Sequence, residues 1–227
     1  MSDEGMPGRS AAGRVADEIR ARIVSGTVQP GAKLPEEEVR ADLGVSRSTL
    51  REGLQLLVRE RLVVHELSRG FFVRVLRRED VRDLFLVREV VECGALSVAS
   101  AVSAVPAGEA ERAGDALAGL RAALGSGEEA ASRRDWQGVA AASIEFHLAL
   151  VALAGSARLD ALIAQVLAEF RLAYAHMDDP LDFHLPFLAR HQVLVDLLAD
   201  GAVGAATEYL RTYLAHSRAA LLERVPE

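Results

Sequence analysis

The chain has 227 residues, half of them hydrophobic, so it can fold as one large domain or two ordinary ones with a sizeable core. Its single cysteine, Cys93, excludes an intrachain disulfide, and without a signal-peptide pattern or a long apolar run we expect a cytoplasmic protein with no membrane partner. The net charge of −7 is unevenly distributed: residues 1–76 hold 12 Lys and Arg against 11 Asp and Glu, whereas residues 77–227 hold 14 against 22.

The start of the chain is predicted to be a disordered lead over residues 1–13, because Gly, Ser, Asp and Pro are frequent there and apolar side chains are few. In residues 14–25 apolar side chains recur on one helical stripe, which predicts a helix on a small core that ends at Gly26. A turn is expected at residues 29–31, and a short helix over residues 36–43.

Residues 43–52 have the pattern of a helix, a short turn and a second helix with a polar start. Gly44 supplies the left-handed backbone that ends the first helix, and Ser46 can cap the second by accepting a hydrogen bond from a free backbone N–H. Apolar residues at three- and four-residue spacing anchor this second helix: Leu50, Leu54, Leu57 and Val58. Its start is therefore expected to project outward.

Short hydroxyls and arginines at the start of the second helix suit the phosphates and base edges of a DNA major groove. These candidates are Ser46, Arg47, Ser48, Thr49 and Arg51. Two β-rich runs at residues 62–66 and 71–75 predict a hairpin wing, with Arg69 and Gly70 at its tip, where the arginine can enter a minor groove. The structural alternative is that Ser46 only caps the helix and that Arg51 only pairs with a nearby glutamate.

Four segments carry a family pattern: residues 23–34 (Ile-Val-Ser-Gly through Pro-Gly-Ala-Lys-Leu), 44–47 (Gly-Val-Ser-Arg), 51–52 (Arg-Glu) and 60–63 (Glu-Arg-Leu-Val). Over residues 14–75 the chain thereby closely resembles the winged-helix domain of the GntR family of bacterial transcription regulators. It is similar in particular to the FadR-like branch, in which an all-helical effector-binding domain, called FCD, follows. The resemblance implies a winged helix-turn-helix domain at residues 14–76.

Two residues depart from that family pattern. Glu37 stands where the family often has an arginine that touches DNA, and a glutamate there would repel phosphate. Gly53 stands where alanine is usual and costs the helix about 1 kcal/mol in propensity. We therefore expect DNA binding with an altered sequence preference or a reduced affinity.

After Glu79 the chain has helical periodicity, rich in Ala and Leu and without β-type alternation, which predicts an all-α bundle over residues 79–225. The expected fold class is mainly α. About six helices are predicted, separated by breaks at residues 105–106, 125–127, 155–156, 178–180 and 201. His176 and His184 are predicted to lie in a loop.

The FCD resemblance also implies a site in this bundle. Arg88 and Glu92 match an Arg-x-x-x-Glu motif of the first FCD helix, and Phe146-His147 matches a middle helix whose histidine points inward. Many FCD proteins hold a divalent metal with an aspartate four residues before that histidine and with two later histidines. In this chain those positions hold Ser143, His191 and Tyr213, so a metal would retain only His147 and His191. The sequence therefore assigns no certain cofactor and leaves a divalent metal at His147 and His191 as an open alternative.

The same positions can instead line a pocket that hydrogen-bonds an organic effector without a metal. The effector-binding candidates are Arg88, which could hold an acid, and Ser143, His147, His191 and Tyr213, with Tyr174 and His216 as further polar side chains. The structural alternative is an arginine paired with a neighbouring acid and histidines satisfied within the core.

Three hypotheses follow. The first is what the resemblance implies, namely a ligand-responsive transcription regulator, a repressor that binds a palindromic double-stranded DNA operator as a homodimer and takes up an organic acid or an apolar metabolite. The second is a ligand-blind dimeric DNA-binding protein. The third is a metal-dependent enzyme in the helical domain, with Glu145 as base and His147 and His191 as metal ligands. We expect no enzyme, because the sequence contains neither a full ligand set nor a nucleophile arrangement.

Overall fold

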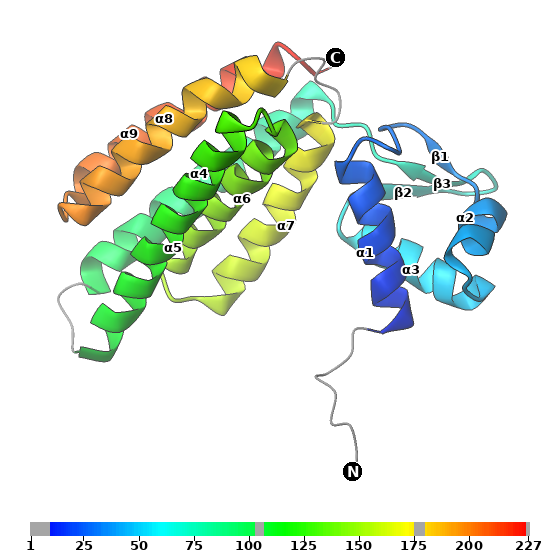
Figure 1. Ribbon diagram of the computed structural model, residues 1–227. Coiled ribbons are helices and arrows are strands. Elements are labelled where there is room, and N and C mark those ends of the chain that lie inside the picture. Colours follow the sequence, from blue (N-terminus) through cyan, green and yellow to red (C-terminus); the bar gives the residue numbers. More distant parts are fainter. Residues whose placement is uncertain (1–9, 103–106, 175–179, 226–227) are drawn as a thin grey trace. The chain divides into compact units, whose positions relative to one another are not determined.

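The computed structural model describes residues 10–102, 107–174 and 180–225 (Figure 1). It divides into two compact units. The first comprises the chain up to Val75 together with the end of helix α7 from Ala168, and the second contains the other helices that follow Val75.

The first unit contains the expected helix-turn-helix and wing. Its elements are α1 (Ala11–Val24), β1 (Lys33–Leu34), α2 (Glu36–Leu43), α3 (Arg47–Arg59), β2 (Val63–Glu66) and β3 (Gly70–Val73). Helix α1 begins before the expected residue 14, because the Ser10 side chain caps it by accepting from Gly13 N at 3.0 Å. Of the predicted disordered lead, residues 10–13 are thus ordered and residues 1–9 lie outside the described residues.

The strands form a three-stranded antiparallel sheet in the order β1-β3-β2. Strand β1 was not predicted, because a strand of two residues is too short for an alternating pattern. Glu66 pairs with Gly70, so the hairpin loop consists of residues 67–69. Arg69 therefore lies in the loop as expected, but Gly70 opens β3 instead of lying at the tip, and its φ of 103° uses backbone freedom that glycine has.

Helix α3 packs against α1 through a close approach at Gly53. A Cβ added to Gly53 would lie 2.6 Å from Val15 Cγ1 and 3.0 Å from the Ala12 carbonyl oxygen. Leu50 and Leu54 on the same helix are also buried. The glycine that costs helix propensity is thus the residue that lets the two helices pack closely.

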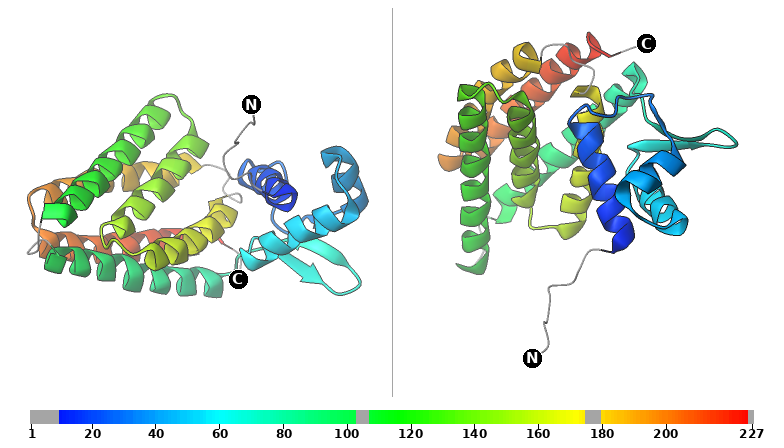
Figure 2. Two further views of the ribbon diagram at one scale, coloured as in Figure 1. Left: turned by 90° about the horizontal axis from the view of Figure 1, so that it is seen from below. Right: turned by 45° about the vertical axis from the view of Figure 1, so that its right-hand side comes forward.

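The described part of the second unit is all helical. Its helices are α4 (Arg78–Val102), α5 (Ala107–Ser132), α6 (Trp136–Ala152), the first part of α7 (Ala157–Tyr174), α8 (Pro180–Ala199) and α9 (Val203–Leu222). Helices α4 and α9 lie side by side, as do α5 and α6 (Figure 2). None of the described helices is long and apolar enough to cross a membrane.

The predicted break at residues 125–127 is wrong, because α5 continues to Ser132. A Cβ on Gly127 would lie 2.8 Å from Leu188 Cδ1, so this glycine serves helix packing and not a turn. The chain turns instead at residues 133–135, where Asp135 caps α6 by accepting from Gly138 N at 2.9 Å. The breaks at Gly155 and Gly201 are confirmed by left-handed φ values of 63° and 71°, whereas residues 105–106 and 178–179 lie outside the described residues.

Candidate DNA-binding surface and buried polar cluster

The start of α3 is built by a side-chain cap, as predicted. Ser46 Oγ accepts from Thr49 N at 3.1 Å and lies 2.9 Å from Ser48 Oγ and 2.8 Å from Thr49 Oγ1. These hydroxyls stabilise the first turn, and the exposed helix end presents backbone N–H groups that favour an anion such as a DNA phosphate.

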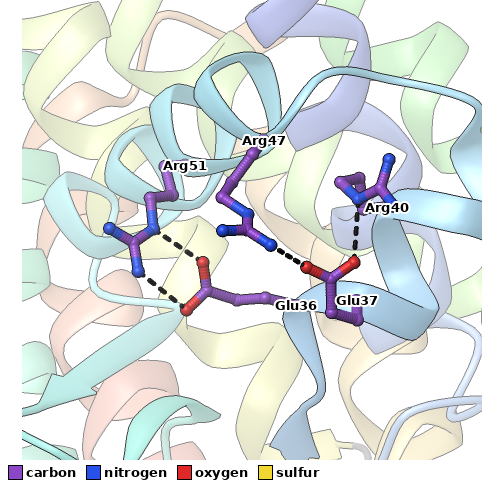
Figure 3. Close-up of polar contacts among 5 residues, drawn as sticks. All are labelled: Glu36, Glu37, Arg40, Arg47 and Arg51. Atoms are coloured by element: carbon purple, nitrogen blue, oxygen red, sulfur yellow. Dashed lines mark hydrogen bonds and ion pairs between the residues drawn. The ribbon is translucent and has the colours of Figure 1, made fainter.

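Both candidate arginines of α3 project into solvent, and each is paired with a glutamate of α2 (Figure 3). The side chain of Arg47 is 71% exposed and contacts Glu37, which also accepts from Arg40 Nε at 3.0 Å. The side chain of Arg51 is 62% exposed, and its Nε donates to Glu36 at 2.7 Å. The alternative that Arg51 pairs with a nearby acid is thus observed, and the exposure of both arginines leaves them accessible to DNA.

Arg69 on the hairpin loop is also exposed and paired. It contacts Glu66, and its guanidinium lies 5.3 Å from the centroid of the Phe72 ring. Leu67 in the same loop is 86% exposed. The hairpin loop thus exposes both a cation, Arg69, and an apolar side chain, Leu67.

In the second unit, five buried side chains from four helices form a continuous chain of hydrogen bonds, which we call the buried polar cluster. Arg88 Nε donates to Glu92 Oε1 at 2.6 Å, and Glu92 Oε2 lies 2.8 Å from His147 Nδ1. The Tyr213 hydroxyl lies 3.1 Å from His147 Nε2 and 3.0 Å from His191 Nε2. Each of the five residues is at most 3% exposed.

The chemistry of the groups determines which one donates and which one accepts in each hydrogen bond of this cluster. A carboxylate only accepts, so Nδ1–H of His147 donates to Glu92, and Nε2 of a neutral His147 then accepts from the Tyr213 hydroxyl. Because Tyr213 has donated its proton, its oxygen accepts from Nε2–H of His191.

Burial and neighbouring side chains together set the protonation states of these groups. Burial lowers the pKa of His147 and lowers that of His191 well below the usual value, so both imidazoles are neutral at neutral pH. Burial raises the pKa of Glu92, but Arg88 and His147 outweigh this effect and hold the pKa below its usual value. The cluster therefore contains one ion pair and two neutral imidazoles.

The donor set does not fit the divalent metal that the FCD resemblance implies. Ser143 supplies a hydroxyl where the resemblance requires a carboxylate, and the Nε2 atoms of His147 and His191 are both engaged by the Tyr213 hydroxyl. Glu145, proposed as a base, is exposed on α6. Among the described residues, no three His, Cys, Asp or Glu side chains form a group that could hold a metal ion.

Other candidates lie apart from the cluster or were missed. His216 is exposed, with Nδ1 2.7 Å from Arg190 Nη1. His184 was predicted in a loop but is buried on α8, where burial lowers its pKa to about 4, and His176 and the Tyr174 side chain lie outside the described residues. Glu92, noted only as part of a motif, joins Arg88 to His147, and its i,i+4 spacing from Arg88 was the available signal.

A winged helix whose recognition helix exposes arginines, followed by a helical unit, is typical of a DNA-binding transcription regulator. Residues 11–73 match the family described as bacterial regulatory proteins, gntR family, and residues 83–216 match the FCD domain. The chain therefore belongs to the GntR family, in the group with an FCD domain. Members of this family are transcription regulators and not enzymes, which confirms the expected class and excludes the enzyme hypothesis.

Individual relatives agree with this assignment. A putative GntR transcriptional regulator from Rhodococcus sp. RHA1 is 40% identical, with a TM-score of 0.83 and coverage of 95% of this chain and 99% of that one. An HTH-type transcriptional regulator in an unstable DNA locus of Streptomyces ambofaciens is 31% identical over 86% of this chain and 78% of its own length. The gluconate operon transcriptional repressor of Bacillus licheniformis is 38% identical over 35% of this chain, and the match spans only about a third of that relative (32%).

Proposed function

We propose that this chain is a ligand-responsive repressor of the cytoplasm that binds a palindromic operator as a homodimer. The observation that carries the proposal is the capped start of α3, which presents Arg47 and Arg51 to solvent. In this proposal both arginines contact bases or phosphates, with Ser46, Ser48, Thr49 and the wing residues Arg69 and Gly70 in support. Repression is supported by the gluconate operon repressor among the relatives.

Dimerisation is supported by apolar exposure on α4. Leu86 and Val90 are 57% and 66% exposed and lie one turn apart, hence on one face of the helix. Large apolar side chains grouped on a surface favour a protein interface, and a self-complementary one gives the twofold symmetry that a palindromic operator needs.

Effector binding is supported by the buried polar cluster. A charge pair inside an apolar bundle costs desolvation energy, and its place beside two neutral histidines suits recognition of an organic acid or of a metabolite with hydrogen-bonding groups. These contacts would come from Arg88, His147, His191 and Tyr213. Ser143, one turn before His147 on α6, would add a hydroxyl. No metal is required in this proposal.

One observation favours the ligand-blind alternative, namely that hydrogen bonds within the chain already link the five side chains of the cluster to one another. A thermal-shift screen of small organic acids and apolar metabolites separates the two. A compound that raises the melting temperature of the wild type, but not that of His191→Ala, and that changes its DNA affinity supports the repressor. Stabilisation without any change in DNA affinity favours the ligand-blind alternative.

The DNA-binding role of Arg47 is tested by selecting an operator from a pool of random duplexes with the full chain. Arg47→Ala is then expected to weaken binding of the selected duplex by about 5- to 150-fold, since a bidentate base contact contributes about 1–3 kcal/mol. Arg59→Ala, an exposed arginine at the far end of α3, is the control and should bind like the wild type. Equal affinities of Arg47→Ala and the wild type, with both folded by circular dichroism, would contradict the assignment.

A further inference from the structure

Arg47 and Arg51, the two arginines proposed to contact DNA, both form ion pairs with glutamates. Glu36 and Glu37 lie in the first turn of α2, and Figure 3 shows both carboxylates directed at the arginines of α3. Glu37 is shared between Arg47 and Arg40, and Glu36 takes the Nε edge of Arg51. Arg47 and Arg51 of the recognition helix thus each already have an anionic partner on the neighbouring helix.

The charges and exposure of these pairs determine what they can do. The pKa of Glu37 is lowered, first by the hydrogen bond from Arg47 and then by that from Arg40, so the carboxylate is ionised at neutral pH. The side chains of Arg47, Arg51 and Glu37 are 71%, 62% and 59% exposed. Exposed pairs of this kind are weak, so DNA can displace them, although each displacement lowers the affinity for DNA.

Displacing these ion pairs lowers the affinity for some DNA sequences more than for others. Non-specific binding depends almost entirely on cations that neutralise phosphates, and an arginine paired with glutamate neutralises less. A base contact depends instead on orientation. A guanidinium has five N–H donors, and Arg51 directs its Nε edge at Glu36, so its Nη1 hydrogens remain available to a base in a fixed direction.

We propose that Glu36 and Glu37 are specificity-determining residues that compete with phosphates for Arg51 and Arg47. They lower the affinity for any duplex, and they lower it least for the cognate operator, where the oriented arginines gain base contacts. This inference rests on the proposed DNA binding through α3, and it names the residues that set the ratio of specific to non-specific affinity.

The test compares the full-length wild type with Glu37→Gln, a substitution of nearly the same shape that removes the charge. The probes are a fluorescent random-sequence duplex of about 24 base pairs and the selected operator of similar length, titrated between about 50 and 200 mM NaCl. Glu37→Gln should bind the random duplex about 5-fold more tightly, with a log–log salt slope steeper by about 0.9, because Arg47 gains one phosphate. The gain on the operator should be smaller, so the specificity ratio falls. Glu36→Gln should act in the same direction through Arg51.

Glu38→Gln is the matched control. Glu38 is exposed on the same turn of α2 and forms no ion pair within the described residues, so this variant removes the same charge without releasing an arginine. Equal shifts in Glu37→Gln and Glu38→Gln would mean that only long-range charge matters, which overturns the proposal. Unchanged affinity and slope in Glu37→Gln overturn it as well, while operator binding by the wild type stands. A wild type and variants that bind neither duplex overturn the proposed function together with this inference.

Discussion

At the scale of single residues, Gly53 shows how a local cost can serve a tertiary contact. By helix propensity alone, Gly53→Ala would stabilise α3 by about 1 kcal/mol. The backbone of α1 opposes this gain, because an added Cβ would lie 3.0 Å from the Ala12 carbonyl oxygen and even closer to Val15. A backbone group cannot move aside as a flexible side chain can, so the steric term is expected to prevail.

We therefore expect Gly53→Ala to lower the free energy of unfolding by about 1 kcal/mol, since overpacking costs about 1–3 kcal/mol and the propensity gain offsets only part of it. Urea titration followed by circular dichroism measures the change. Gly94→Ala is the control, because Gly94 is exposed in α4 with nothing within 4 Å of an added Cβ, and this variant should be slightly stabilising. A Gly53→Ala protein at least as stable as the wild type would contradict the packing argument.

At the scale of elements, α8 carries two histidines that burial keeps neutral. Burial lowers the pKa of His184 to about 4 and lowers that of His191 well below its usual value. In the unfolded chain both would titrate near the ordinary pKa of about 6.5. Below that pH the unfolded state binds more protons than the folded state, so stability is complete above about pH 6.5 and is lost as the pH falls toward the folded pKa.

From His184 alone we expect a loss of about 2 kcal/mol of unfolding free energy between about pH 7 and pH 5. The measurement is urea denaturation at several pH values. His184→Gln should reduce the slope of stability against pH by about one bound proton. A wild type whose stability does not change over this range would show that the α8 histidines are not buried in the neutral form.

At the scale of the whole molecule, binding to a palindrome requires two recognition helices held together, because each contacts one half-site. The exposed pair Leu86 and Val90 on α4 is the proposed contact between copies. Charged side chains placed on both copies of a self-complementary interface repel each other, since each residue meets the same patch on its partner.

Leu86→Glu together with Val90→Glu is therefore expected to give a monomer in light scattering and to lower operator affinity by at least about 10-fold, since one half-site is lost. Leu162→Glu on α7, where the leucine is 44% exposed, is the control for an added surface charge and should leave the dimer intact. A double variant that remains dimeric would place the interface elsewhere.

The sequence by itself determined the fold class, the order of the helix-turn-helix and wing, the cap at Ser46 and the bounds of α2. These features were predictable because they depend on interactions within a few residues: a serine three positions before the N–H that it accepts from, a left-handed glycine after a helix, or an apolar stripe at helical spacing. The resemblance to the family added the prediction of which side chains of α3 contact DNA, and the prediction that His147 of α6 and His191 of α8 face inward, where both are buried.

Only the tertiary structure decided which side chains meet across elements. Arg47 and Glu37 lie 10 positions apart, and His147 and Tyr213 lie 66 apart, so no local pattern connects them. The same holds for Gly53, because its partner Val15 belongs to another helix. It also holds for His184, which is buried although the nearby Asp-Asp-Pro sequence predicted a loop. The physical reason is that caps and turns are satisfied by neighbours in the chain, whereas burial, ion pairing and close helix approach depend on how helices pack against one another.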